Sequence, residues 1–265
     1  MHIIGQEKIL NKIDSYSLST LPHNICLFGQ DGSGRHTLVK YMSEKFCVPV
    51  VTVAKDVDYE DIVEYQRCVN DKIYLVNLNE LNEKAQNKLL KFVEEPAAHV
   101  FVVMIARSEI GVIDTILNRC MKFKLENYTK EELRQVRRFE DDRLYEVCKT
   151  PGQLSIVDTK SFNELINVCE AIVTKINRAS YSNTISIAQK INYKEEYDKF
   201  DFNLFLNTLE YVAFKTFKET NSEISYKVYN IVNRYKSKIL TINNSPIKEN
   251  YIINLLTNLW NEVAQ

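Results

Sequence analysis

The hydrophobic residues in the first half of the chain fall into short continuous runs, with stretches of helical spacing between them. The runs that indicate buried strands are Ile25–Phe28, Val48–Val53, Ile73–Val76, Val100–Ala106 and Met121–Leu125. Strands that are apolar on both faces and alternate with helices are typical of a parallel sheet covered by helices on each side. We therefore expect an α/β domain in residues 1–126.

Helices are predicted before and between these strands. The first, Gln6–Leu18, has apolar side chains at the i, i+3, i+4 and i+7 spacing of an amphipathic helix. The others are Thr37–Phe46, Tyr59–Cys68, Glu83–Glu94 and Ile110–Leu117. Pro96 ends the helix before it, because proline lacks the backbone N–H that a helix interior needs.

The remaining chain carries helical signals only. We expect a small helical lid in residues 127–160, with helices at Thr129–Phe139 and Asp141–Cys148, and an all-α domain in residues 161–265. The helices of the last domain have broad apolar faces. The final one opens at Ser245–Pro246, where a capping residue precedes proline at the first helical position.

Composition excludes several classes of function. The formal net charge of −1 argues against a protein that grips nucleic acid through bulk electrostatics, so any contact with DNA is expected to be local or shared with partners. The six cysteines contain no C-x-x-C pair, which predicts reduced thiols and no zinc site. No stretch reaches the roughly 18 apolar residues that span a bilayer. We therefore expect a cytoplasmic protein with no membrane partner.

A glycine-rich stretch, Phe28–Thr37, closes the first predicted strand and opens the helix after it. Its sequence, FGQDGSGRHT, is that of a phosphate-binding loop G-x-x-x-x-G-K-[ST] with altered chemistry. We call this stretch the glycine loop. Arg35 stands at the position of the lysine, and His36 stands at the position of the hydroxyl that binds Mg²⁺. The glycines that let backbone N–H groups approach phosphate are kept: Gly29, Gly32 and Gly34.

Hydrolysis in such proteins also needs an acidic residue after an apolar strand, to hold Mg²⁺ and polarise water. The candidate strand ends in Asn77–Leu78, and neither residue is acidic. The Asn77 amide oxygen could bind a metal weakly, but Leu78 cannot act as a base. Together with Arg35 and His36, these departures predict that the chain does not hydrolyse nucleotide, because each removes transition-state stabilisation.

Several segments, in order, resemble one known family. They are Ile4-Gly5-Gln6, His23–Thr37, Gln86–Pro96 (QNKLLKFVEEP) and Ile116–Cys120 (ILNRC). The family is that of the bacterial DNA polymerase III clamp-loader subunits of the AAA+ class, and the resemblance is greatest to their delta-prime type. It implies an AAA+ α/β domain, a helical lid, and a helical collar that joins subunits into a ring.

The resemblance also sorts the chain between two types of subunit. Motor subunits keep the lysine, the threonine and an Asp-Glu pair, and they carry an arginine in the lid. Here the lid segment Thr150–Ser155 reads TPGQLS, without that arginine, and is similar to the delta-prime form. Family members commonly hold a four-cysteine zinc module, whereas the corresponding interval here is short and contains only Cys47 and Cys68. The expectation is a non-hydrolysing subunit without zinc or any other metal.

The resemblance implies roles for individual residues. Arg119 matches the arginine finger that touches the γ-phosphate of ATP held by the neighbouring subunit, although a role in capping a surface loop stays open. Ile4 and Gly5 match an adenine-side motif, and Thr37 ends the glycine loop. This loop is expected to bind nucleotide weakly or not at all, and no cofactor of the chain's own is expected. The helix containing Gln86 and Lys88 faces DNA in the family, which predicts contacts with phosphates.

The implied partners are ATPase subunits of the gamma or tau type, a delta-type clamp opener, the sliding clamp, and primer–template DNA reached through the assembled complex. The chain would then be part of the DNA polymerase III holoenzyme, a DNA-directed DNA polymerase. Two alternatives stay open. One is a weakly active ATPase of the gamma or tau type that uses Arg35, and the other is an adaptor with the AAA+ fold that binds another replication or repair protein.

Overall fold

The computed structural model describes residues 3–176, 202–239 and 247–263. The chain divides into two compact units, Met1–Glu132 and Leu133–Gln265. The first unit contains the sheet, and the second is built from helices in its described part. The expected division of the second part into a lid and a collar at residue 160 stays a prediction.

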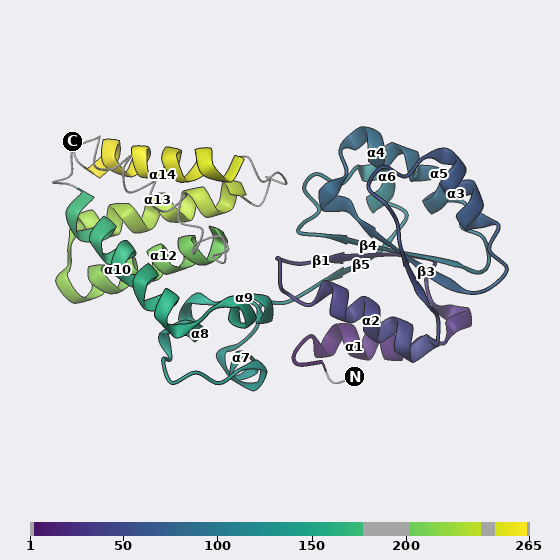
Figure 1. The fold of residues 1–265 in the computed structure, drawn as a ribbon, viewed down its shortest axis with the longest axis horizontal. Helices are drawn as coiled ribbons and strands as arrows, with labels where there is room; N and C mark the ends of the chain where they lie inside the picture. Colours follow the sequence, from purple (N-terminus) through teal and green to yellow (C-terminus); the bar gives the residue numbers. More distant parts are fainter. Residues whose placement is uncertain (1–2, 177–201, 240–246, 264–265) are drawn as a thin grey trace. The chain divides into compact units, whose positions relative to one another are not determined.

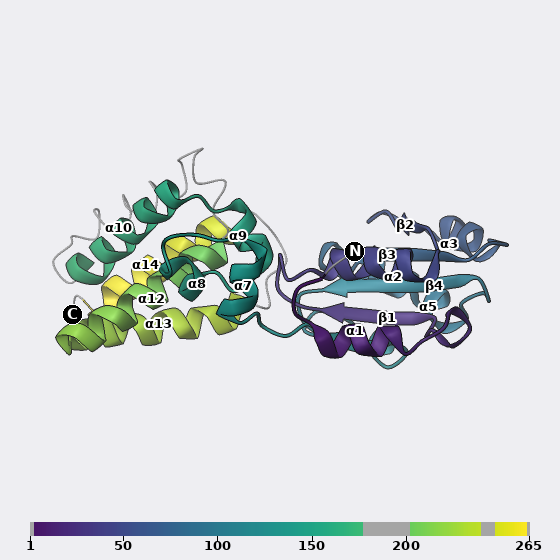
Figure 2. The ribbon, with the colours of Figure 1, turned by 90° about the horizontal axis from the view of Figure 1, so that it is seen from below.

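The first unit is built on a five-stranded sheet in which every pairing is parallel. The strand order is β2-β3-β4-β1-β5, and Figure 2 shows β3, β4 and β1 lying side by side. The strands are β1 (Asn24–Phe28), β2 (Val50–Thr52), β3 (Lys72–Asn77), β4 (Val100–Ala106) and β5 (Met121–Lys124). The predicted parallel α/β fold is confirmed, and each predicted apolar run forms a strand.

Helices cover both faces of the sheet (Figure 1). One face carries α1 (Glu7–Asp14) and α2 (Arg35–Phe46), and the other carries α3 (Tyr59–Gln66), α4 (Glu83–Lys88), α5 (Leu90–Glu94) and α6 (Asp114–Leu117). Side chains along β4 alternate between the two cores, since successive residues of a strand point to opposite faces. Val102 and Met104 belong to one core, while Val103 and Ile105 belong to the other.

Several predicted helices differ in extent from the observed ones. The helix expected over Ile110–Leu117 forms only from Asp114, and the one expected over Thr129–Phe139 ends at Val136. The helix expected over Glu83–Glu94 is divided at Leu89 into α4 and α5. The helix expected from Gln6 ends at Asp14, and a short 3-10 turn, η1 (Leu18–Thr20), follows it. In that turn the Ser17 side chain accepts a hydrogen bond from the Thr20 backbone N–H, and the Thr20 side chain accepts one from the Ser17 backbone N–H. These bonds satisfy the backbone without further helix.

The register of the sheet decides which loops meet. Phe28 of β1 lies opposite Ala106 of β4 and Lys124 of β5, and Asn77 of β3 lies opposite Ile105. The residues that follow β1, β3 and β4 therefore emerge at one edge of the sheet. In open α/β sheets this carboxyl edge is where ligands bind.

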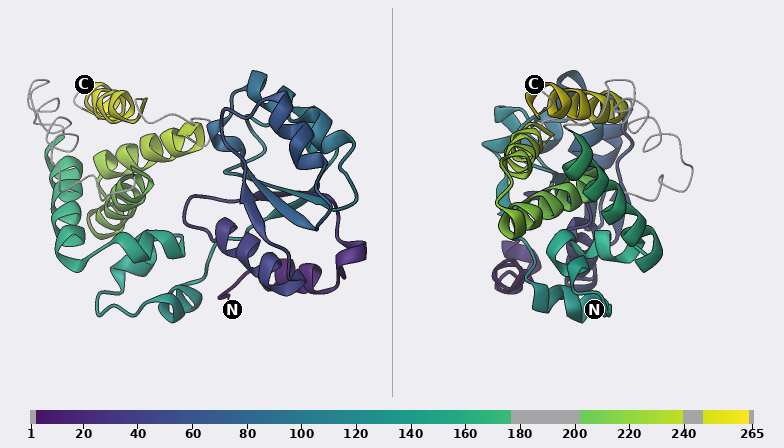
Figure 3. Two further views of the ribbon diagram at one scale, coloured as in Figure 1. Left: turned by 45° about the vertical axis from the view of Figure 1, so that its right-hand side comes forward. Right: turned by 90° about the vertical axis from the view of Figure 1, so that its left-hand side faces the viewer.

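The second unit contains no strand among its described residues. Its helices are α7 (Lys130–Val136, which begins in the first unit), α8 (Arg143–Val147), α9 (Pro151–Ile156), α10 (Thr159–Lys175), α12 (Phe202–Thr220), α13 (Glu223–Ile239) and α14 (Ile247–Val263). Figure 3 shows α12 lying along α13, and α12 also packs on α10. The predicted cap at Ser245–Pro246 lies outside the described residues. Over the part of the chain that the structure describes, no helix is both long and apolar enough to cross a bilayer.

Candidate functional site

The glycine loop joins β1 to α2, as its sequence predicts. Gly34 has a φ of 97° and stands at the N-cap of α2, a backbone conformation that glycine adopts without strain. At Gly29 a Cβ atom would lie 2.6 Å from Ser33 Oγ and 3.1 Å from Leu125 Cβ, so a larger residue would require these neighbours to shift. The strand, tight turn and helix that a phosphate loop requires are all present.

The Arg35 side chain is buried and does not project into solvent. Its side chain is only 7% exposed, and Nη2 donates to Asp31 Oδ1 at 2.7 Å. The other terminal nitrogen, Nη1, is buried and has no hydrogen-bond partner. Burial lowers the pKa of the Arg35 guanidinium from its ordinary value, while the Asp31 charge acts in the opposite direction. The residue at the lysine position is therefore engaged by the loop itself.

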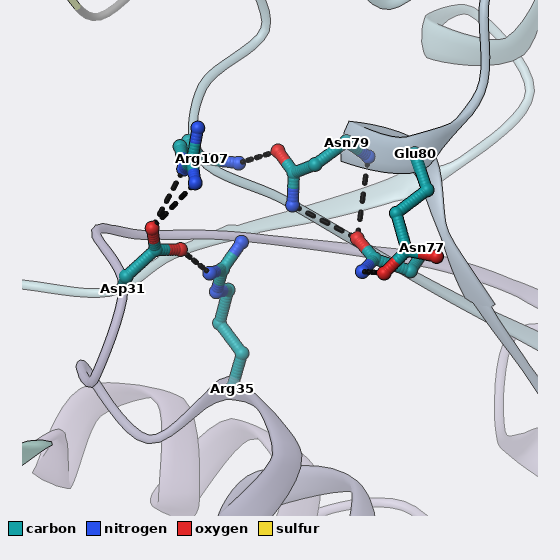
Figure 4. A network of polar contacts seen from close by, with 6 residues as sticks. All are labelled: Asp31, Arg35, Asn77, Asn79, Glu80 and Arg107. Atoms are coloured by element: carbon teal, nitrogen blue, oxygen red, sulfur yellow. Dashed lines mark hydrogen bonds and ion pairs between the residues drawn. The ribbon is translucent and has the colours of Figure 1, made fainter. Parts of the chain in front are cut away.

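A second arginine reaches the same carboxylate from the neighbouring strand. Arg107 follows directly after β4, and its Nε and Nη2 lie 2.8 and 2.7 Å from Asp31 Oδ2. Figure 4 shows Asp31 between the guanidinium groups of Arg35 and Arg107. Burial raises the pKa of Asp31, but the hydrogen bonds and charges of the two arginines outweigh it and hold the pKa below its ordinary value. We call these three residues the carboxylate clamp.

The degenerate acidic position is also bonded internally. The Asn77 amide oxygen accepts hydrogen bonds from the backbone N–H and the side-chain Nδ2 of Asn79, at 3.2 and 2.9 Å. Its Nδ2 donates to Glu80 Oε1 at 2.6 Å within the 3-10 turn η2 (Leu78–Glu80). Leu78 is 2% exposed and belongs to the core. The Asn77 oxygen that could have bound a metal thus already accepts two hydrogen bonds.

This turn is linked to the carboxylate clamp through one further bond. The backbone N–H of Arg107 donates to Asn79 Oδ1 at 2.9 Å, as Figure 4 shows. The structure therefore brings the glycine loop and the degenerate acidic motif together in one polar network. Within the described residues, no group of three or more His, Cys, Asp and Glu side chains is placed to hold a metal.

Tyr128 closes the other side of the glycine loop. Its hydroxyl donates to the Ser33 carbonyl at 2.8 Å, and a Cβ on Gly5 would lie 3.0 Å from its ring. Gln6 fixes the same segment, because its side chain donates to the Glu126 carbonyl and accepts from the Glu126 N–H. Burial raises the pKa of Tyr128. The N-terminal motif and the loop are thus joined by the segment after β5.

The other predicted nucleotide-binding residues are less constrained. His36 is exposed, and Ile4 and Thr37 are half-buried. His36 presents an imidazole where a phosphate loop carries the hydroxyl that binds Mg²⁺, and Mg²⁺ prefers oxygen ligands.

Arg119 lies at the opposite edge of the sheet from the glycine loop. It precedes β5, whose Met121 pairs with Ile25 near the start of β1, whereas the loop follows the end of β1. At roughly 3.3 Å per residue, the strand separates the backbone of the two sites by about 13 Å. Arg119 Nη1 donates to the Thr115 carbonyl at 2.9 Å, and Nη2 lies 3.0 Å from Glu94 Oε1.

The prediction that Gln86 contacts DNA is wrong. Gln86 is 1% exposed, and its Nε2 donates to the carbonyls of Leu81 and Gly111. Its Oε1 accepts from the Ile113 N–H at 3.0 Å. The side chain is therefore a buried connector between the start of α4 and the segment before α6. Lys88 is exposed, and its contact with DNA stays a prediction.

The chain is similar in sequence to several known proteins. The family model for the DNA polymerase III delta subunit matches residues 59–129. The DNA polymerase III gamma subunit of Buchnera aphidicola subsp. Baizongia pistaciae is 26% identical over 166 residues, which is 49% of this chain and 45% of that protein. Over these segments the chain is similar to subunits of DNA polymerase III.

The uncharacterized protein MG007 homolog of Mycoplasma pneumoniae is also similar to the chain. It is 28% identical over 151 residues, which is 52% of this chain and 59% of that protein. The chain spans about half the length of the curated relatives it matches. The Thermotoga maritima RuvB Holliday junction branch migration motor superposes with a TM-score of 0.53 at 15% identity, covering 83% of this chain and 96% of that one. This likeness shows that the two chains share a fold.

The match to the delta-subunit family model covers Asn77, Arg107 and Arg119 but not the glycine loop. Sequence reasoning did not single out Arg107, Asp31 or Tyr128. A signal for Arg107 exists, because it follows the most apolar predicted strand, at the edge where parallel strands place their ligands. Its partner could not be named without the order β4-β1.

Proposed function

We propose that the chain is a delta-prime-like clamp-loader subunit that does not hydrolyse ATP and helps to load the sliding clamp onto primed DNA. One observation carries this proposal. The groups at the lysine and acidic positions, Arg35 and Asn77, are both bonded inside the protein, through Asp31 and through Asn79 with Glu80. The groups that hydrolysis needs are thus replaced or already engaged.

Electrostatics favours weak or no binding of nucleotide. Two arginines would ordinarily attract polyphosphate, but the Asp31 carboxylate lies within hydrogen-bond distance of both. A phosphate placed there would meet like charge or would have to displace Asp31, and either costs free energy. His36 offers no hydroxyl for Mg²⁺, and Leu78 offers no base. We propose no bound cofactor for this chain.

Arg119 is proposed to act on ATP held by a neighbouring subunit. Its place at the far edge of the sheet separates it from the chain's own loop, so a catalytic role requires a second subunit. An arginine finger acts in that way, by stabilising charge on the transferred phosphoryl group. The alternative, a capping role, is supported by its bonds to Thr115 and Glu94, and the two roles predict different effects of mutation.

The proposed partners are ATPase subunits of the gamma or tau type, a delta-type clamp opener, the sliding clamp and primer–template DNA, with the helices of residues 161–265 serving as a collar. We propose that this assembly works in the cytoplasm. A second candidate, a weak ATPase, is favoured by the similarity to gamma subunits and by the retained strand, loop and helix geometry. An adaptor for another replication or repair protein is the third.

Reconstitution separates these candidates. The full chain is mixed with the host's motor subunit, delta-type subunit and clamp, and both complex formation and clamp loading on primed DNA are measured. We expect the chain to enter the complex and to be needed for loading, and to release no phosphate from ATP on its own. Phosphate release that disappears in Gly34→Ala would support the weak ATPase. If the chain binds neither the motor subunit nor the sliding clamp, the adaptor becomes the better explanation.

A further inference from the structure

Two guanidinium groups, one of them from Arg35 in the first turn of α2, contact the Asp31 carboxylate. The helix is 12 residues long, and its N-terminus carries a partial positive charge. No acidic residue lies in its first turn, and no side chain caps it at Gly34. Arg35 and Arg107 add two guanidinium groups. Among the charged groups drawn in Figure 4, Asp31 is the acid that contacts both.

Arg35 has hydrogen-bond donors that are not all used. Arg35 is 7% exposed, and its buried Nη1 has no hydrogen-bond partner. The Ser33 and Ser108 hydroxyl oxygens nearby in sequence, one in the loop and one directly after Arg107, are also buried without a partner. A buried guanidinium with unused donors is costly, and an anion with several oxygens would satisfy more of them than one carboxylate does.

The members of the carboxylate clamp differ in how firmly the fold holds them. Arg35 is almost fully enclosed, and Arg107 is 27% exposed, whereas Asp31 is 41% exposed and lies on the loop. If one group moves, the exposed and loop-borne carboxylate moves at the least cost. Arg35 and Arg107 therefore form a preformed anion site. The Asp31 carboxylate occupies this site and is the group that an anion could displace from it.

We propose that Asp31 is a built-in counter-anion, which replaces a bound phosphate and keeps the glycine loop ordered without nucleotide. This inference rests on the proposed non-hydrolysing role of the loop and deepens it. The cationic site itself retains its affinity for tetrahedral phosphate-type anions, and Asp31 masks that affinity. The chain would then be ready for assembly whether or not nucleotide is present.

Thermal unfolding of the full chain tests the proposal through chemical rescue. Wild type, Asp31→Ala and the isosteric Asp31→Asn are unfolded with increasing inorganic pyrophosphate, and with sodium chloride at the same ionic strength. We expect both variants to have a lower Tm than wild type in buffer. Pyrophosphate should raise their Tm saturably by about 3 °C beyond the effect of chloride, because a ligand that binds the folded state stabilises it. Wild type should respond to the two salts alike.

Asp141→Ala is the matched control. Asp141 is chelated by Arg143 in the second unit, with Nε–Oδ1 and Nη2–Oδ2 distances of 2.9 and 2.7 Å. Its removal also takes a carboxylate partner from an arginine, which keeps its hydrogen bond to Asn163, yet pyrophosphate should give no specific gain there. Equal stabilisation of wild type and the Asp31 variants by pyrophosphate would overturn the counter-anion role, and so would no specific gain in Asp31→Asn. Neither result would bear on clamp loading, which is measured with the assembled complex.

Discussion

Glu94 and Arg119 form an ion pair that joins the end of α5 to the turn after α6, with 3.0 Å between Glu94 Oε1 and Arg119 Nη2. Their side chains are 43% and 40% exposed. Exposed pairs of this kind contribute about 0.2–1 kcal/mol to stability. Arg119 can therefore leave Glu94 at little cost if a phosphate of a neighbouring subunit competes for it.

Arg119→Ala is predicted to depress the DNA-stimulated ATPase of the assembled clamp loader. An arginine finger contributes roughly 10³-fold or more to phosphoryl transfer, so the adjoining ATP site should become nearly silent. The total ATP turnover of the assembly should fall by the fraction that this one ATP site normally contributes. Steady-state phosphate release with primed DNA and clamp measures the effect. Arg67→Ala, another exposed arginine of the first unit, is the control and should leave turnover unchanged.

If Arg119 only caps the loop, the pattern reverses. Arg119→Ala would then lower the Tm of the isolated chain, through loss of the Thr115 and Glu94 contacts, and leave turnover of the assembly intact.

Glu94→Gln is predicted to change stability by less than about 1 kcal/mol, because the pair it breaks is half-exposed. Under the finger hypothesis it also releases Arg119 from a competing carboxylate. The assembly should then reach half-maximal ATPase at a lower concentration of this chain, and the shift should vanish in Arg119→Ala. Titration of the chain into a fixed amount of motor subunit gives the measurement. A shift that persists without Arg119 would argue against the competition.

Asp31 gives the stability of the chain a defined pH dependence. Its pKa in the folded protein is lowered, whereas an unfolded aspartate titrates near 3.9. A lowered folded pKa means that the stabilisation is present above about pH 4 and is lost as pH falls through the folded value. The difference in unfolding free energy between wild type and Asp31→Asn should therefore shrink as pH falls from 6 to 3. Urea titrations at each pH measure it, and a difference that grew on acidification would contradict the sign.

The strands of the first unit could be predicted from the sequence because burial on both faces imposes apolar runs. Val100–Ala106 shows this most clearly, since all its residues are buried. The contact between Asp31 and Arg107 could not be predicted in this way. Arg107 is 76 residues away along the chain and meets Asp31 only through the pairing of β4 with β1.

Gln86 shows the opposite difficulty. A polar residue on a predicted amphipathic helix is ordinarily exposed, so the sequence suggested a surface contact. The burial of its amide depends on the main chain at Gly111 and Ile113, about 25 residues later, which bonds both ends of the side chain. No local pattern records that contact.

Tyr128→Phe is predicted to loosen the glycine loop while leaving the fold intact. The substitution removes one hydrogen bond to the Ser33 carbonyl, worth about 0.5–1.5 kcal/mol, and keeps the ring against Gly5. Hydrogen exchange of the loop amides should quicken several-fold, while exchange within β4 stays unchanged. Tyr128→Ala should have the larger effect because the ring contact is lost as well. Equal loop exchange in wild type and Tyr128→Phe would show that this bond does not hold the loop.

Gln86→Ala and Lys88→Ala are predicted to have different effects on stability, because Gln86 is buried and Lys88 is exposed on the same helix. Gln86→Ala leaves the Ile113 N–H and the Gly111 carbonyl without their partner, which should lower the free energy of unfolding by about 2–4 kcal/mol. Lys88→Ala removes an exposed charge and should change stability by less than about 0.5 kcal/mol. If Lys88 contacts a DNA phosphate in the assembled complex, its loss should also reduce the salt dependence of DNA affinity by about one phosphate contact. Urea unfolding of the chain and DNA titrations of the complex at several salt concentrations measure the two effects, and an unchanged salt slope would remove Lys88 from the DNA interface.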